Sequence, residues 1–240
     1  MEIGIIKLAL LAGGRGTRLG KLTDRIPKSM VKIDGRPFIA YQLDLLRKKG
    51  ITDIVLCIGR FREHIEDYVG NGSKFGLNVE YSYDVTFSGT GGAIQGALPV
   101  LGDTFWVMYG DSYLDIDFSP ILEYFLKYSF NPEYAGLMTV IKSSSYAGGN
   151  VIFRNKIVTY PRTLLDGNYI DYGLSIFRKN VFSDNIMSSV LRYGLKKLLG
   201  EGRSHKILGY EIKEMFHEIG SVEGLLETSN YIKDNKRGIV

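Results

Sequence analysis

The chain has 240 residues, of which 45% are hydrophobic and 23% are charged. This is an ordinary globular composition, and it argues against a disordered or a membrane-spanning chain. A single cysteine, Cys57, excludes an internal disulfide and fits a reducing compartment. The formal net charge of +4 is too small to indicate a protein that binds duplex nucleic acid.

Basic residues gather in one early segment. Between Arg15 and Arg36 there are seven lysines and arginines against two aspartates, an excess larger than the +4 of the whole chain. A small polyanion suits such a local charge better than a long one. The apolar run at residues 3–12 is too short to span a membrane and lacks a signal-peptide pattern. A cytoplasmic protein without a membrane partner is therefore expected.

Apolar runs of strand length alternate with helix-period segments through the first half of the chain. Buried strands are predicted at residues 5–12, 54–58, 79–83 and 105–109, and helices at 37–49, 62–69 and 91–98. Such alternation predicts a mainly parallel sheet that is covered on both faces. Right-handed crossovers would place the carboxyl ends of its strands along one edge, where ligands bind.

The second half is richer in strand patterns. A helix that opens at Ser119 is followed by strand patterns at residues 134–141, 150–153, 157–160 and 169–177. We interpret them as antiparallel strands added to the same sheet, because no Pro-, Ser- or Gly-rich linker marks a boundary. The expected organisation is a single α/β domain over residues 1–240.

A glycine-rich turn follows the first predicted strand, with the order Leu11-Ala12-Gly13-Gly14-Arg15-Gly16-Thr17-Arg18-Leu19. Three glycines allow positive φ and a close approach of ligand to backbone, and successive N–H groups in such a turn bind anions. Arg15, Arg18 and the later Lys28 would add charge-assisted contacts. Together these features indicate a phosphate-binding loop; the alternative is a solvated glycine loop with surface cations.

Two common phosphate-binding motifs do not fit this turn. The P-loop motif needs glycine where Arg15 stands, and Ser or Thr where Leu22 follows Lys21. The dinucleotide fingerprint needs a third glycine where Leu19 stands. These tests exclude a P-loop ATPase and an NAD-type dehydrogenase.

The turn, with Pro27-Lys28-Ser29-Met30 after it, resembles the signature of the sugar-1-phosphate nucleotidyltransferases, or nucleotide-sugar pyrophosphorylases. That family's loop reads G-G-x-G-T-R-L and is followed by P-K-P, whose second proline is Ser29 here. The resemblance covers about residues 8–232 and is nearest to the short heptose 1-phosphate and mannose 1-phosphate guanylyltransferases. Its later matches are Thr90-Gly91-Gly92-Ala93, Tyr109-Gly110-Asp111-Ser112, Asp115-Ile116-Asp117-Phe118, Tyr146-Ala147-Gly148, Asn150-Val151 and Glu218-Ile219-Gly220-Ser221.

The resemblance implies a three-layer, Rossmann-like nucleotide-diphosphosugar transferase fold with a mixed, mainly parallel central sheet. Residues 1–118 would form the nucleotide-binding half and residues 119–240 the sugar-binding half. The implied reaction joins a nucleoside triphosphate to a sugar 1-phosphate and releases pyrophosphate, for surface polysaccharide biosynthesis. Such a phosphoryl transfer depends on in-line positioning and charge neutralisation rather than on a nucleophilic side chain.

The resemblance also assigns roles to single residues. Arg18 would neutralise the departing phosphates, Lys28 would reach the α-phosphate, and Asp111 would bind Mg²⁺ with Glu218, where the family carries aspartate. The nucleotide-binding set is Leu11, Ala12, Gly13, Gly14, Arg15, Gly16, Thr17, Tyr83, Thr90, Gly91 and Gly92. The sugar-phosphate set is Gly110, Arg162, Asp171 and Gly173.

Two other classes of protein stay open at this point. Asp115 and Asp117 form the D-x-D triplet with which GT-A type glycosyltransferases hold a metal, although acids before a helix near Ser119 explain them adequately. Separate substitution of Asp111 and Asp117 discriminates between these interpretations. Departures from the family pattern, of which Glu218 is one, keep open a non-catalytic nucleotide-sugar sensor.

The substrates are less constrained than the reaction. The chain length and the turn at Thr90 favour GTP with a heptose or mannose type of sugar 1-phosphate. Uridylyl, cytidylyl and thymidylyl transfer are the alternatives. For two residues a purely structural role is the alternative to a role in the site: Tyr83 as a core tyrosine and Asp111 as a turn aspartate. The many aromatic residues and the β-rich second half are compatible with a homodimer.

Overall fold

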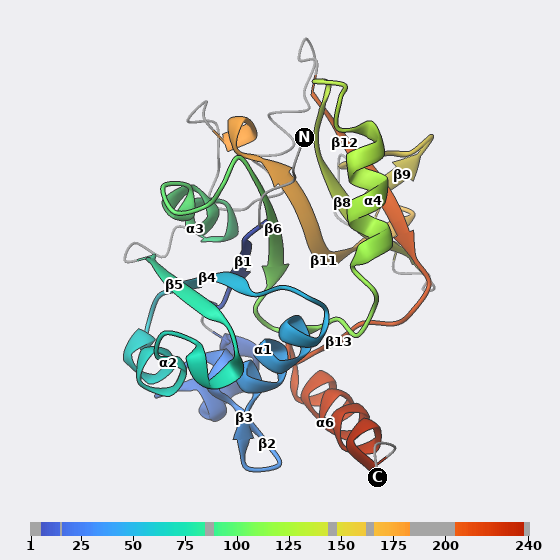
Figure 1. Cartoon of the computed structure of the whole chain (residues 1–240). Helices are drawn as coiled ribbons and strands as arrows, with labels where there is room; N and C mark the ends of the chain where they lie inside the picture. The colour runs from blue at the N-terminus through green and yellow to red at the C-terminus, as the bar shows by residue number, and fades with distance from the viewer. Residues whose placement is uncertain are drawn as a thin grey trace.

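The computed structural model describes residues 6–14, 16–84, 89–143, 148–161, 166–182 and 205–237. Within them a nine-stranded sheet has the strand order β5-β4-β1-β6-β11-β8-β12-β10-β9. Figure 1 shows this sheet at the centre with helices around it. All its strands except β10 and β11 run in one direction. The predicted mixed, mainly parallel sheet is confirmed.

The first half of the chain forms the parallel part of this sheet. Its strands are β1 (Leu8–Leu11), β4 (Asp53–Ile58), β5 (Asn78–Tyr83) and β6 (Thr104–Tyr109). The runs in β1, β4 and β6 are almost entirely apolar because these strands are covered on both faces. The predictions for β4, β5 and β6 were short by one residue at the start. Strand β1 lies within the predicted range.

Alternation along each strand divides the core between the two faces of the sheet. The helices are α1 (Phe38–Lys48), α2 (Arg62–Val69), α3 (Gly89–Ala97) and α4 (Ser119–Tyr128). In β1, Leu8 and Leu10 pack in the cluster that contains α1, α2 and α4, whereas Ala9 packs with α3. Successive side chains of a strand point to opposite faces. The result is the predicted three-layer arrangement.

The second half extends the same sheet. Its strands are β8 (Tyr134–Lys142), β9 (Ile152–Arg154), β10 (Ile157–Thr159), β11 (Tyr169–Arg178) and β12 (Lys206–Ile212). Strand β11 is antiparallel to both β6 and β8, as predicted. Strand β12, parallel to β8, and helix α6 (Val222–Arg237) were not predicted. Helix α6 is mostly polar in sequence, and it packs against the protein through a narrow apolar stripe that includes Leu225 and Ile232.

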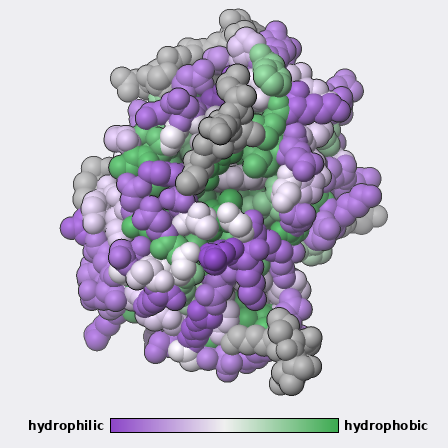
Figure 2. Space-filling view, viewed as in Figure 1, coloured by the Kyte–Doolittle hydropathy of each residue, from purple (hydrophilic) through white to green (hydrophobic). Residues whose placement is uncertain are grey.

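Short elements complete the described structure. They are η1 (Thr17–Thr23), η2 (Lys28–Met30), β2 (Lys32–Ile33), β3 (Arg36–Pro37), η3 (Ser73–Phe75), β7 (Ser112–Tyr113), η4 (Lys179–Phe182) and β13 (His217–Glu218). Across the described ranges, no helix combines the length and apolar character needed to cross a membrane. Hydrophilic residues cover most of the face drawn in Figure 2.

The strand order creates a switch point beside β1. The chain adds β4 and β5 on one side of β1 and β6 on the other, so a crevice opens at the carboxyl ends of β1 and β6. Here the amide of Gly110 donates to the carbonyl of Leu11 at 3.1 Å. A Cβ atom on Gly110 would lie 2.7 Å from the Cα atom of Ala12. Only glycine permits this approach of the two strand ends.

We predict that Gly110→Ala lowers the free energy of unfolding by about 1–3 kcal/mol, as overpacking does elsewhere. Gly14→Ala is the matched control, because a Cβ atom at Gly14 would meet nothing within 4 Å. That control should change stability by less than about 0.5 kcal/mol. Urea unfolding measures both. Equal stability of the two variants would show that the strand ends separate without cost.

Candidate active site

A cavity of about 530 Å³ opens at the switch point. Its walls come from the ends of β1, β5 and β6, from η1 and η2, from the start of α3 and from the segment before α6. Most of the residues predicted for catalysis, nucleotide and metal line it, together with Gly110 of the sugar-phosphate set: Leu11, Ala12, Gly13, Gly14, Gly16, Thr17, Arg18, Lys28, Thr90, Asp111 and Gly110. The lining also includes Ser29, Asp84, Gly89, Ala93, Tyr109 and Gly220, which were not assigned to the site.

Gly16 joins the glycine turn to the basic segment that follows. It has a φ of 66°, in the left-handed region that glycine adopts at little cost. A Cβ atom there would lie 2.9 Å from Cγ2 of Thr23 and 3.1 Å from Cβ of Lys28. The Thr23 hydroxyl donates to the Gly16 carbonyl at 2.9 Å. These contacts bring Lys28 close beneath the turn.

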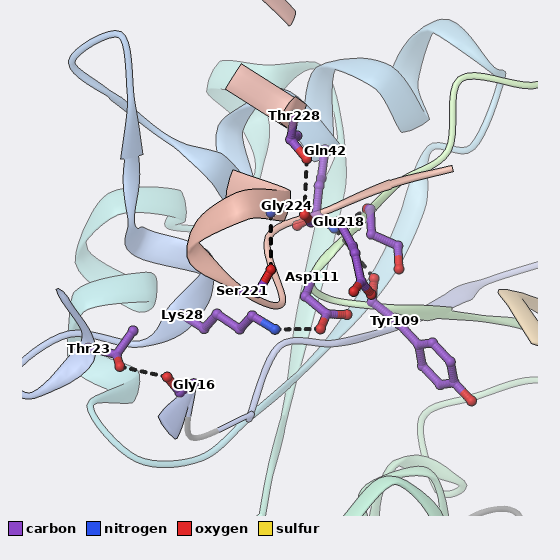
Figure 3. A network of polar contacts seen from close by, with 11 residues as sticks. Gly16, Thr23, Lys28, Gln42, Tyr109, Asp111, Glu218, Ser221, Gly224 and Thr228 are labelled. Carbon is purple, nitrogen blue, oxygen red and sulfur yellow. Dashed lines mark hydrogen bonds and ion pairs between the residues drawn. The ribbon is translucent and has the colours of Figure 1, made fainter. Parts of the chain in front are cut away.

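An ion pair joins Lys28 to Asp111 across the cavity (Figure 3). The Nζ of Lys28 lies 2.5 Å from Oδ2 of Asp111, although 83 residues separate them in the chain. Lys28 is only 8% exposed, so the pairing offsets the cost of burying its charge. The site thus holds a cation and a carboxylate in contact at the cavity.

A second carboxylate lies beside Asp111. Strand β13 pairs antiparallel with β7, which sets Glu218 opposite Ser112, and the amide of Ile219 donates to the carbonyl of Asp111 at 2.9 Å. Burial raises the pKa of Glu218, and the charge of Asp111 raises it further, while Lys28 and Arg18 oppose the rise. The pairing of β7 with β13 therefore brings Asp111 and Glu218, which are far apart in the sequence, next to each other.

Arg18 approaches the same corner of the cavity from η1. A Cβ atom on Gly220 would lie 2.8 Å from Oε1 of Glu218 and 3.4 Å from Nη2 of Arg18. Glycine at position 220 thus leaves room for both charged groups. From α6, the buried Thr228 hydroxyl donates to the carbonyl of Glu218 at 3.1 Å. The C-terminal helix therefore holds one carboxylate of the pair.

The acidic pair fits a hard divalent cation in part. Asp111 and Glu218 supply oxygen ligands, which Mg²⁺ prefers. Nowhere in the described ranges do three or more His, Cys, Asp or Glu side chains form a metal cage. Mg²⁺ usually binds one or two carboxylates and completes its shell with water and substrate phosphates. The donor set therefore suits a cation that arrives with a phosphate ligand.

Gln42 supports the turn that carries Asp111, and the sequence did not reveal it. This fully buried residue of α1 donates from Nε2 to the carbonyl of Ser112 at 2.8 Å and of Tyr109 at 3.5 Å. Its Oε1 is buried without a partner among the described atoms, at a cost of about 1–3 kcal/mol. The available signal was a glutamine on an otherwise apolar helix face.

A polar pair lies beside the cavity at β11. The hydroxyl of Tyr109 donates to Oδ2 of Asp171 at 2.8 Å, and the amide of Gly173 donates to Oδ1 at 3.0 Å. Burial raises the pKa of Asp171, while these two hydrogen bonds lower it. Gly173 has a φ of 94° where the β11–β8 register shifts. Tyr109 lines the cavity, and Asp171 and Gly173 lie directly behind it.

Residues 7–235 match the family model for nucleotidyl transferases. The chain belongs to this nucleotidyl transferase family. It is 32% identical over 227 residues to N-acetylmuramate alpha-1-phosphate uridylyltransferase of Neisseria meningitidis serogroup B, covering 92% of this chain and 96% of that protein. It is 28% identical over 214 residues to D-glycero-alpha-D-manno-heptose 1-phosphate guanylyltransferase of Aneurinibacillus thermoaerophilus, covering 88% and 91%.

A solved structure has the same fold. HddC from Yersinia pseudotuberculosis, complexed with GMP-PN, superimposes with a TM-score of 0.77 at 23% identity, covering 95% of this chain and 99% of that one. The matched relatives are named for uridylyl, guanylyl and thymidylyl transfer. They share sugar-1-phosphate nucleotidyl transfer, and this protein is an enzyme of that class. The nucleotide and the sugar vary among them.

Some predicted residues lie outside the cavity of this nucleotidyltransferase. Tyr83 is 49% exposed, and its hydroxyl donates to Oε1 of Glu66 on α2 at 2.7 Å. The guanidinium of Arg62 covers the Tyr83 ring at 4.9 Å from its centroid. Tyr83 is therefore neither a core tyrosine nor a residue of the cavity wall.

Two predicted glycines also lie outside the cavity wall. Gly91 and Gly92 lie in the first turns of α3, behind the wall that Gly89, Thr90 and Ala93 form. Arg15, Arg162, Tyr146 and Ala147 lie outside the described residues.

The D-x-D triplet has structural partners. Asp115 forms an ion pair with Lys49 at 2.8 Å, and Oδ1 of Asp117 accepts from the amide of Ser119 at 2.9 Å. This hydrogen bond to the first residue of α4 lowers the pKa of Asp117 and supports the entry of the chain into the helix. Neither acid is among the residues that line the described cavity. The triplet is thus explained without a glycosyltransferase metal site.

We predict that Asp111→Asn lowers kcat/KM for nucleotidyl transfer by roughly 100-fold or more, because a carboxylate beside Lys28 is lost. Asp117→Asn, the matched control, should keep kcat/KM within about twofold because its carboxylate accepts from the amide of Ser119 at the start of α4 and does not line the described cavity. Steady-state pyrophosphate release measures both variants. Loss of activity in Asp117→Asn alone would favour the glycosyltransferase interpretation instead.

We also predict a pH-dependent effect of Asp171 on stability. A carboxyl whose pKa is raised in the folded state stabilises the protein below its unfolded pKa of about 3.9. This contribution is lost as the pH rises through the folded pKa. The stability of the wild type relative to Asp171→Asn should therefore fall as the pH rises from about 4. Urea unfolding of both proteins at several pH values tests this, and parallel pH curves would contradict it.

Proposed function

We propose that this sugar-1-phosphate nucleotidyltransferase transfers GMP from GTP to a heptose or mannose 1-phosphate, with Mg²⁺, in the cytoplasm, for surface polysaccharide biosynthesis. In this proposal residues 1–118 hold the nucleotide and residues 119–240 the sugar, within a single domain. The observation that carries the proposal is the order of polar groups along the sheet edge. This order runs from Asp84, through the glycine turn and Asp111, to Asp171.

The spacing of the strands supports this placement of substrates. Asp84 follows β5 and Asp111 follows β6, three strand positions apart in the order β5-β4-β1-β6. At about 4.8 Å per strand the separation is about 14 Å. A nucleoside triphosphate bound at this edge would have its base at β5 and its α-phosphate at β6, with its β- and γ-phosphates turned back over the glycine turn after β1. The sugar would then lie over β11, the next strand.

The carboxylate of Asp84 supports guanine as the base. Asp84 lines the cavity together with Thr90, at the end remote from Asp111 along the sheet edge. An ionised carboxylate only accepts hydrogen bonds, and its two oxygens can take two donors. Guanine presents two adjacent donors, N1–H and N2–H₂, whereas uracil presents the single N3–H between two carbonyl groups. The pairing of two acceptors with two donors therefore favours GTP.

The proposed chemistry is a direct displacement. The phosphate oxygen of the sugar attacks the α-phosphorus of GTP, a new P–O bond forms, and the bond to the β-phosphate breaks to release pyrophosphate. Lys28 neutralises charge on the α-phosphate, and Arg18 with the amides of the glycine turn neutralises the leaving pyrophosphate. Bound Mg²⁺ would supply Lewis-acid stabilisation of the phosphates from Asp111 and Glu218. Roles for Arg15 and Arg162 remain predictions.

A second candidate is transfer of UMP to an N-acetylated sugar acid phosphate. The observation that favours it is the 32% identity over 227 residues to a protein named N-acetylmuramate alpha-1-phosphate uridylyltransferase. A carboxylate at Asp84 can accept the single N3–H of uracil, so the base pocket does not oppose UTP outright. The two candidates therefore differ in both substrates and can be separated in one assay.

The test is a matrix of GTP, UTP, CTP and dTTP against heptose, mannose, N-acetylmuramate and glucose 1-phosphates, followed by pyrophosphate release. GTP with heptose or mannose 1-phosphate should exceed the UTP reactions in kcat/KM by about 100-fold, because uracil supplies only one of the two donors that the paired acceptors can take. Chelation of divalent cations should abolish the reaction. Preference for UTP with N-acetylmuramate 1-phosphate would establish the second candidate in its place.

A further inference from the structure

The buried amide of Gln42 holds the turn that carries Asp111 from outside the cavity. Gln42 lies on α1, and it is not among the residues that line the described cavity. Its Nε2 donates to two main-chain carbonyls, of Tyr109 and Ser112. These carbonyls flank Gly110 and Asp111 on either side. One side chain therefore ties both ends of the turn, and the turn cannot widen without breaking a hydrogen bond.

The orientation of the amide follows from its partners. Both contacted groups are carbonyl oxygens, which only accept, so the nitrogen of the amide must face them. This leaves Oε1 buried without a partner among the described atoms. The neighbouring buried positions on the same helix, Ile39, Leu43 and Leu46, are apolar. An apolar residue would fill position 42 without an unpaired oxygen, so packing alone does not explain a glutamine there.

The turn is held from a second direction by β13. The amide of Ile219 donates to the carbonyl of Asp111 at 2.9 Å, and Glu218 is paired with Ser112 across the short strands. Figure 3 shows Gln42, Asp111 and Glu218 gathered at this point. The main chain of Asp111 is thereby fixed relative to that of Glu218. Two carboxylates that share one cation need such a fixed separation, because outer contacts orient the ligands of a metal.

We propose that Gln42 is a positioning residue, which holds Asp111 at the separation from Glu218 that a shared divalent cation requires. The proposal rests on the proposed function only in that Asp111 and Glu218 bind that cation together with the nucleotide. Gln42 is not part of the described cavity wall and touches neither substrate nor metal. It acts through the Tyr109–Ser112 backbone, and its loss weakens cation binding more than nucleotide binding.

The experiment uses the full chain with Gln42→Met, which keeps a long unbranched side chain and removes the donor. Mn²⁺ is titrated into the protein–nucleotide complex, and free Mn²⁺ is followed by electron paramagnetic resonance. The Mn²⁺ concentration at half-saturation should rise about 10-fold, as it does when outer contacts of metal ligands are removed. The KM for the triphosphate at saturating Mg²⁺ should change by less than about twofold.

Tyr41→Phe is the matched control. Tyr41 is buried on the same helix, and its hydroxyl donates to a main-chain carbonyl, that of Ile33 at 3.0 Å. This contact supports β2 rather than the Asp111 turn. The control should therefore lose stability without a change in the Mn²⁺ titration. If Gln42→Met does not fold, Gln42→Leu serves as the second variant for the same measurements.

The outcomes separate this inference from the proposed function. Wild-type Mn²⁺ affinity in Gln42→Met, with stability lowered as in Tyr41→Phe, would overturn the positioning role and leave Gln42 as a structural residue. Weakened Mn²⁺ binding in Gln42→Met but not in Tyr41→Phe supports it. Asp111→Asn is titrated alongside. Unchanged Mn²⁺ binding in that variant would overturn the proposed cation site itself, and the positioning role with it.

Discussion

The close approach of Gly110 to the end of β1 is the constraint on which the rest of the site depends. Because glycine has no Cβ atom, the turn after β6 can lie directly against the turn after β1. A Cβ atom would not fit there. The glycine turn and Asp111 thereby become walls of one cavity. Lys28, packed beneath Gly16, then meets Asp111 in an ion pair. A bulkier residue at position 110 would separate the glycine turn from the carboxylate of Asp111.

The cavity region carries both positive and negative side chains, which suits ligands that also carry charges of both signs. Lys28 and Arg18 face Asp111 and Glu218 in a partly buried corner, where burial and the charge of Asp111 raise the pKa of Glu218. A triphosphate that arrives with a divalent cation brings matching charges of both signs. Each protein charge can then exchange its internal partner for a substrate group, so little net charge is buried at any stage.

Helices from opposite ends of the chain support the two carboxylates. Gln42 on α1 holds the Asp111 turn, and Thr228 on α6 holds the main chain of Glu218. Both are fully buried polar residues that donate to main-chain carbonyls, so both belong to the rigid part of the molecule rather than to its loops. Side chains on rigid elements are placed more precisely than side chains on loops, and precise placement suits a proposed reaction that depends on positioning and charge neutralisation.

The sequence alone determined the parallel strands, the helices that cover them and the glycine turn, because local periodicity and glycine content act over a few residues. Tertiary structure decided everything that depends on which elements meet. A glutamine on an apolar helix face marks Gln42 as unusual, but no local pattern shows that it, Asp84 or Thr228 belongs to the site, since the groups that they meet belong to other elements. Tyr83 shows the same limit: β5 ends where predicted, but its side chain contacts Glu66 and Arg62 of α2 and is not among the residues that line the described cavity.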